Sequence, residues 1–280
     1  MTNKPLIGFM QGRLIDAPDN EDLDWFPFRS WEKEFELANK LNLSTIELVL
    51  DRGLNKKNPI WSLRERIKIK RLLNKYNLES YSCCINFIID HPLFEEDIYT
   101  STLEAINYLD EIDVKYVILP FFQESTLENE FVVDSLKKIS KEVEKKGIQL
   151  LVESDLGSNE LSKLLSTPPL RKVGVVYDIG NATFNRNCII EDWNILKDRI
   201  RHVHIKDKDS QGKNIFLGEG LVNFKEFFDI LQRNEYKGKL VFETSRGAEA
   251  LKTAKRNLNF INRFLKNFDS TNTNGKEIYG

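Results

Sequence analysis

The sequence predicts an α/β fold, a single-domain (β/α)₈ barrel spanning residues 1–268. Short β-rich runs alternate about eight times with segments of helical period, and no linker or low-complexity block divides the 280 residues. Strand–helix alternation produces a parallel sheet, and eight such units in about 270 residues are typical of a closed barrel. The last segment, 269–280, is polar and is expected to form a flexible tail.

The expected strands are short runs rich in aliphatic, β-branched and aromatic residues. In chain order they are Leu6–Met10, Thr45–Leu50, Leu78–Cys84, Tyr116–Leu119, Ile148–Val152, Gly174–Tyr177, Arg201–Ile205 and Lys239–Phe242. A doubly wound open sheet is the competing arrangement. It is disfavoured because the first strand is accompanied by GFMQGR, which lacks the G-x-G-x-x-G pattern of dinucleotide-binding sheets.

Apolar residues recur on one helical face in the segments between these strands. One stripe begins at Trp31, another begins at Val132, and the longest runs from Leu251 to Phe268. Three connections exceed the usual length of βα loops, and we expect at least one of them to cover a site. These connections are 14–28, 86–97 and 207–223.

The charge balance excludes functions that depend on a strong electrostatic field. The chain has 41 basic and 43 acidic residues, so neither nucleic acid nor a membrane is expected as a partner. The adjacent Cys83 and Cys84 should point to opposite faces of a strand, which disfavours a disulfide between them. The first apolar run is too short for a secretory signal, and a cytoplasmic location is expected. The sequence does not decide between a monomer and a homo-oligomer.

Four strand-like runs in the second half of the chain end in a side chain that can bind a metal. They read LLVE, VVYD, HVH and LVFE, and their last residues are Glu153, Asp178, His204 and Glu243. The C-terminal ends of parallel strands lie on one rim of a barrel, so these side chains can meet. Three carboxylates in a small space repel one another unless a cation lies between them. The pattern predicts a divalent metal at the barrel mouth; alternatively, each polar residue marks only where a strand meets its loop.

Several motifs, in this order, resemble the xylose-isomerase-like TIM barrels. They are IGFMQGRL, TIEL, LLVESD, VYDIGN, HVHIKD, LGEGLVNF and LVFET, and the resemblance covers Pro5 to Phe268. The family includes sugar isomerases and epimerases, inosose-processing enzymes and, more distantly, metal-dependent apurinic endonucleases. The resemblance implies one divalent ion and an acid/base pair formed by the two glutamates. The implied metal ligands are Glu153, Asp178, His204 and Glu243.

These residue types agree with proton transfer beside a carbonyl group. Such a reaction needs a base, an acid on another side, and a cation that holds the enediolate oxygens. Three carboxylates with one imidazole suit Mn²⁺, Mg²⁺ or Co²⁺, with Zn²⁺ possible. We expect a metal-dependent isomerase or epimerase of a small sugar, sugar phosphate or cyclitol. Glu153 and Glu243 would transfer the proton through a metal-stabilised enediolate.

Three other functions stay open. A lyase, or dehydratase, acting on a keto-sugar or inosose could use the same site, because loss of water also begins with proton removal beside a carbonyl. The barrel could also bind a sugar or other small polyol without converting it. An apurinic endonuclease is disfavoured, because a multi-zinc site needs more imidazoles than the three present, which are His91, His202 and His204.

Further residues near the strand ends are candidates for substrate contacts. His202 has the same strand parity as His204 but lies further from the strand end, which favours a structural role for His202. The family commonly has Asp-x-x-His at the sixth strand, whereas this chain has Asn181, which can bond a hydroxyl but cannot take up a proton. Two arginines after the first and last strands could clamp an anionic group. The expected substrate contacts are Glu47, Asn181, Lys206, Arg13 and Arg246.

Overall fold

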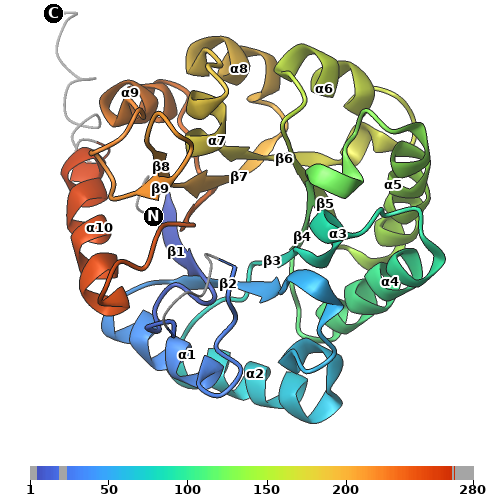
Figure 1. Ribbon diagram of the computed structural model, residues 1–280, viewed down its shortest axis with the longest axis horizontal. Helices are drawn as coiled ribbons and strands as arrows, with labels where there is room; N and C mark the ends of the chain where they lie inside the picture. The colour runs from blue at the N-terminus through green and yellow to red at the C-terminus, as the bar shows by residue number, and fades with distance from the viewer. Residues whose placement is uncertain (1–4, 19–23, 267, 269–280) are drawn as a thin grey trace, which may run out of the picture.

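Eight parallel strands close into a barrel at the centre of the molecule (Figure 1). The structure is a computed structural model that describes residues 5–18, 24–266 and 268. The strands follow one another around the barrel in the order β1-β10-β7-β6-β5-β4-β3-β2. Their bounds are β1 Leu6–Met10, β2 Thr45–Leu50, β3 Ser82–Ile85, β4 Tyr116–Phe121, β5 Gln149–Ser154, β6 Gly174–Asp178, β7 Ile200–Ile205 and β10 Lys239–Phe242. The predicted single barrel is confirmed.

A ring of helices surrounds the barrel in Figure 1 and buries the apolar stripes of the connecting segments. In the fifth helix, for example, Val132, Leu136 and Ile139 are buried, while Lys138 and Lys141 are exposed. The helices are α1 Trp31–Lys40, α2 Leu63–Tyr76, α3 Phe87–Asp90, α4 Glu96–Glu111, α5 Glu130–Val143, α6 Ser158–Leu165, α7 Ile179–Phe184, α8 Ile189–Leu196, α9 Phe224–Arg233 and α10 Ala250–Leu265. Short 3₁₀ helices lie in the connections: η1 Arg52–Leu54, η2 Pro59–Trp61, η3 Gln123–Ser125, η4 Glu144–Lys146 and η5 Leu170–Lys172.

Alternation along the strands divides the apolar core into two parts. Side chains that point outward, including Cys83 and Val203, pack against the helices in one continuous core. Side chains that point inward form a small apolar cluster, which we call the barrel plug. It consists of Met10, Val49, Cys84, Ile118, Leu151, Val176 and Val241. Cys83 and Cys84 therefore lie on opposite faces, as expected, and both are free thiols.

The third strand begins later than we predict from the sequence. The expected range was Leu78–Cys84, but β3 starts at Ser82. The chain leaves α2 through Asn77, which has a left-handed φ of 51°, and Glu79 forms only an isolated bridge with Thr45. Leu78 is buried in the outer core directly after the helix, which explains the apolar signal at that position.

Two of the three long connections contain regular structure. Segment 86–97 holds α3 and the first residues of α4, and segment 207–223 holds an antiparallel pair of short strands, β8 (Asp207–Lys208) and β9 (Asn214–Ile215). Segment 14–28 is described except for 19–23, and the expected tail at 269–280 lies outside the described residues. None of the helices described is long and apolar enough to cross a membrane.

Candidate metal centre and active site

Glu153, Asp178, His204 and Glu243 meet at the C-terminal mouth of the barrel. Each offers one ligand atom, and these four atoms all lie within 4.8 Å of one another. Strand parity explains this, because each of the three carboxylates lies two residues beyond a member of the barrel plug and therefore also points inward. The four side chains singled out by the sequence pattern thus share one small space.

The imidazole of His204 is held from two sides. Its Nε2 lies 3.0 Å from Glu47 Oε1, and its Nδ1 lies 3.1 Å from Glu243 Oε2 and 3.3 Å from Glu153 Oε2. Burial alone would lower the pKa of His204, but the carboxylates of Glu153 and Glu47 raise this pKa well above its ordinary value. A ring engaged at Nε2 in this way presents Nδ1 to the carboxylates at the mouth.

Glu47 lies behind His204 and joins the two histidines of β7. Its Oε2 lies 2.9 Å from His202 Nε2 and accepts a hydrogen bond of 2.6 Å from Ser82 Oγ. Burial would raise the pKa of Glu47, but the two imidazoles outweigh burial and hold this pKa below its ordinary value. Glu47 and His202 are both 0% exposed. Glu47 therefore contacts both histidines of β7, and its expected contact with substrate stays a prediction.

Lys206 brings an ammonium group between two of the carboxylates. Its Nζ lies 2.8 Å from Asp178 Oδ2 and 2.9 Å from Glu243 Oε2. Burial would lower the pKa of Lys206, but these carboxylates raise it. For Glu243 the effects are reversed: burial would raise its pKa, but Lys206 keeps this pKa well below its ordinary value. Asp178 Oδ1 accepts a hydrogen bond of 2.7 Å from the backbone N–H of Asn181 and caps α7. One carboxylate oxygen of Asp178 thus caps α7, and the other faces Lys206 in the cluster.

The residues present fit a divalent cation. Asp178 Oδ2 and His204 Nδ1 are buried and make no hydrogen bond within the described part of the chain, although both lie near charged groups. Buried polar atoms of this kind are costly unless charge or a ligand compensates them. Three carboxylates and one imidazole, with no thiolate in the group, are typical ligands of Mn²⁺, Mg²⁺ or Co²⁺.

A cavity of about 360 Å³ lies at this mouth. Four of the residues predicted from the sequence line it, which are Glu153, Asn181, Lys206 and Glu243. Sequence reasoning missed other polar residues of the lining, namely Asp24, Arg52, Asn86, Gln123, Asp155, Asn185 and Lys208. Lys208 could have been found, because it continues the alternation of His204 and Lys206, whereas the loop residues carry no periodic signal. Many polar groups around a small cavity suit a polyhydroxylated molecule.

Arg13 and Arg246 lie in the loops after β1 and β10, and both are buried. Arg246 donates through Nε to the carbonyl of Gly12 and through Nη2 to the carbonyl of Trp25, the latter at 2.8 Å. Arg13 Nη2 lies 3.6 Å from an Asp24 carboxylate oxygen. Arg246 therefore ties the loop after β10 to the loop after β1, and the expected arginine clamp for an anionic substrate stays a prediction.

The fold and the site together define the class of this protein. It is a (β/α)₈ barrel with a metal-capable group of three carboxylates and one histidine at its C-terminal mouth. The chain belongs to the xylose isomerase-like TIM barrel family, whose family model matches residues 35–264. This match covers seven of the eight barrel strands and all four residues of the cluster. The family resemblance carried by the sequence motifs is therefore confirmed.

Individual relatives are distant. The chain is 25% identical over 173 residues to an inosose dehydratase of Mesomycoplasma hyopneumoniae (strain 7448), which is 52% of this chain and 57% of the relative. Among solved structures, a D-allulose 3-epimerase from Methylomonas sp. superposes with a TM-score of 0.70 at 17% identity, covering 93% of this chain and 98% of that one. A xylose isomerase-like TIM barrel protein from Mycobacterium smegmatis, solved in complex with magnesium, gives a TM-score of 0.68 at 17% identity, covering 96% and 100%. The structural likenesses establish a shared fold, and the chain spans little more than half the length of that dehydratase.

Proposed function

We propose that this protein is a divalent-metal-dependent isomerase or epimerase of a small sugar, sugar phosphate or cyclitol. The observation that carries the proposal is the placement of Glu153 and Glu243, which both line the cavity of about 360 Å³ and both lie within 3.3 Å of His204 Nδ1. Two carboxylates around one cavity are the groups that proton transfer on carbon requires. The structural likeness to a D-allulose 3-epimerase supports this substrate class.

Glu153 and Glu243 would act from different sides of the substrate. They stand in β5 and directly after β10, and β6 and β7 separate these two strands around the barrel. One carboxylate takes the proton from the carbon beside the carbonyl, and the electron pair of that C–H bond forms the C=C bond of an enediolate, whose negative charge lies on the former carbonyl oxygen. A proton then returns to the opposite face or to the neighbouring carbon. Substrate and product have the same composition, because one proton replaces another.

The remaining residues of the site bind and orient. Asp178 and His204 would complete the ligand set of the two glutamates, and Glu47 would keep His204 in its orientation. A divalent cation held there would supply positive charge beside the carbonyl oxygen as the proton leaves. Asn181 and Lys206, which line the same cavity, would donate hydrogen bonds to substrate hydroxyls or to a phosphate.

A dehydratase of an inosose or keto-sugar is the second candidate. The similarity to an inosose dehydratase favours it, and so does the position of Lys206. Loss of water begins with the same proton removal, but its second step gives a proton to a leaving hydroxyl. Lys206 Nζ, 2.9 Å from Glu243 Oε2, would hold the leaving hydroxyl by a hydrogen bond, and the glutamate that took the proton would return it to that hydroxyl.

Turnover in D₂O tests the proposal and separates its two forms. The protein is loaded with Mn²⁺, Mg²⁺ or Co²⁺ and incubated with ketoses, their phosphates and inososes, and the products are analysed by mass spectrometry and NMR. An isomerase or epimerase gives a product with one deuterium on carbon and no other change in composition. A dehydratase gives a product lacking one water. Absence of turnover across this panel with all three metals would contradict both candidates.

A further inference from the structure

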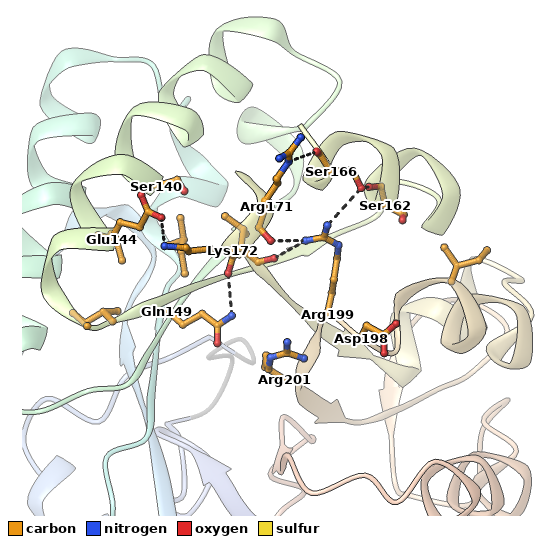
Figure 2. A pocket seen from close by; sticks show the side chains of 16 residues that line it. Ser140, Glu144, Gln149, Ser162, Ser166, Arg171, Lys172, Asp198, Arg199 and Arg201 are labelled. Carbon is orange, nitrogen blue, oxygen red and sulfur yellow. Dashed lines mark hydrogen bonds and ion pairs between the residues drawn. The ribbon is translucent and has the colours of Figure 1, made fainter. Parts of the chain in front are cut away.

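A second cavity, of about 770 Å³, lies at the opposite end of the barrel from the metal-capable cluster. Figure 2 shows its lining from close by. Its walls come from the ends of α5, α6 and α8 and from residues at the N-terminal ends of β5, β6 and β7, including Gln149, Val173 and Arg201. Arg201, in β7, stands five positions before Lys206 at the barrel mouth, or about 16 Å of extended chain. A molecule in this cavity therefore does not reach the proposed active site.

The cavity carries an excess of positive charge, although the whole chain has a formal net charge of −2. Four basic and two acidic side chains line it, and these are Arg171, Lys172, Arg199, Arg201, Glu144 and Asp198. Lys172 pairs with Glu144 at 2.6 Å. Within the described part of the chain, no carboxylate lies at salt-bridge distance from any of the three arginines. Three guanidinium charges in one cavity thus lack a protein counterion.

Two of these guanidinium groups are held in place by neighbouring backbone. Arg171 Nε donates to the carbonyl of Ser166 at 3.2 Å, and Arg199 Nη1 donates to the carbonyl of Arg171 at 3.1 Å. Figure 2 shows both arginines beside Ser166, where Arg199 Nη2 also lies 3.5 Å from the Ser166 hydroxyl. The terminal nitrogens of Arg171 have no partner among the described residues. Arg171 is thus an exposed side chain with one hydrogen bond to the backbone and with most of its donors unused.

Arg201 reaches the same cavity from the barrel wall. Arg201 lines the cavity at a register shift in the pairing of β6 with β7, where it falls between the paired residues Ile200 and His202. A glycine makes room for it, because a Cβ at Gly174 of the neighbouring β6 would lie 3.0 Å from Arg201 Cγ and 2.6 Å from Leu151 Cδ2. The guanidinium makes one long contact, 3.4 Å from Nη1 to the carbonyl of Ile200. Arg201 is half-buried, and most of its donors are also unused among the described residues.

We propose that this cavity binds a small phosphorylated molecule, with Arg171 and Arg201 donating to phosphoryl oxygens and Arg199 positioning Arg171. Guanidinium groups match phosphate oxygens through paired N–H donors. Arg171 is exposed at the rim of the cavity, whereas Arg199 and Arg201 are half-buried, which strengthens their attraction to an anion relative to an open surface. The volume exceeds that of a phosphate ion and leaves room for an organic body, to which the hydroxyl of Ser162 can bond. This site is independent of the proposed function at the barrel mouth.

Calorimetric titration with pyrophosphate and with inorganic phosphate, at constant ionic strength, tests the proposal on the full chain. We expect saturable binding of pyrophosphate. Arg171→Ala and Arg201→Ala should each weaken it about tenfold, because each removes charge-assisted hydrogen bonds, and the double variant should show no saturable binding. Asp198→Asn should tighten binding about threefold, because it removes a negative charge from the cavity wall.

Three controls make the result specific. Thermal melting of each variant without ligand separates lost binding from lost folding. Arg233→Ala removes an exposed arginine elsewhere, on α9, and should leave binding unchanged. Lys208→Ala alters the barrel mouth and should also leave binding unchanged. No saturable binding to the wild type, equal binding by the wild type and the double arginine variant, or lost binding in Lys208→Ala would each overturn the proposal.

Discussion

Glu47 Oε1 and His204 Nε2 lie 3.0 Å apart, and this contact joins β2 to β7 across the interior of the barrel. Because Nε2 is engaged, the imidazole presents Nδ1 to Glu153 and Glu243 at the mouth. A carboxylate behind a ligand histidine fixes the orientation of its ring and makes it more basic. We therefore propose that Glu47 is a positioning residue for the metal centre.

Glu47→Gln should lower the affinity for Mn²⁺ about 10- to 100-fold, the usual effect of losing such a partner. The reason is that a neutral amide offers one acceptor oxygen to two imidazoles. Calorimetric titration with Mn²⁺ measures the change. Ser82→Ala is the matched control, because it removes the hydrogen bond to Glu47 Oε2 but leaves the contact with His204. Equal Mn²⁺ affinities in Glu47→Gln and the wild type would show that His204 does not depend on Glu47.

Lys206→Met should destabilise the protein in EDTA and enlarge its stabilisation by Mn²⁺. Without the ammonium, the carboxylates of Asp178 and Glu243 face one another unneutralised; removing one partner of a buried ion pair costs about 3–5 kcal/mol. An added cation replaces the lost charge and no longer competes with Lys206. Melting temperatures with EDTA and with Mn²⁺ measure both effects, and Lys208→Met serves as the control at the same mouth. The same Mn²⁺-induced shift in Lys206→Met and wild type would contradict the account.

Glu34 gives the protein a pH-dependent stability that is unrelated to the metal centre. Its carboxylate accepts hydrogen bonds from the backbone N–H groups of Gly12 at 2.8 Å and Leu14 at 3.1 Å. Burial raises the pKa of Glu34 from 4.5 to about 7, against the effect of these N–H groups and of Arg13 and Arg246. Because the folded-state pKa lies above the unfolded value, this contribution to stability is complete below pH 4.5 and is lost as the pH rises through about 7.

Urea unfolding between about pH 5.5 and 8.5 tests this expectation. The free energy of unfolding of the wild type should fall relative to that of Glu34→Gln as the pH rises, by at most about 3 kcal/mol. Glu32→Gln, an exposed position on the same helix, should follow the wild type. Parallel pH profiles of the wild type and Glu34→Gln would show that Glu34 does not change its protonation in this range.

The fold and the metal-capable cluster could be predicted because their signals are local in sequence. Glu153, Asp178, His204 and Glu243 each stand at the same place relative to a short apolar run, and parallel strand ends share one rim. The alternation of side chains along a strand is also a local signal, and it correctly predicts that Cys83 and Cys84 lie on opposite faces of β3. The predicted start of the third strand is wrong because Leu78 is apolar for a different reason, which is its burial after α2.

Long-range contacts carried no such signal. Glu47 and His204 are 157 residues apart, and Arg246 reaches Gly12 across 234 residues. A strand-end glutamate looks the same in sequence whether it faces a cavity or a histidine, and a loop arginine looks the same whether it binds an anion or a carbonyl. Only the packing of the folded chain brings these partners together, so the contacts of Glu47 with His204 and of Arg246 with Gly12 could not be predicted from the sequence.

The central claim is that Glu153 and Glu243 form the proton-transfer pair of a metal-dependent enzyme. The most direct measurement is the rate of deuterium incorporation from D₂O into the substrate carbon, for the wild type, Glu153→Gln and Glu243→Gln, each with saturating Mn²⁺. Each amide keeps one oxygen for a metal but cannot accept the proton. We predict appreciable Mn²⁺ binding by both variants and rates lower by about 10²- to 10⁴-fold. Full activity in both variants, or turnover with no solvent deuterium in the product, would contradict the claim.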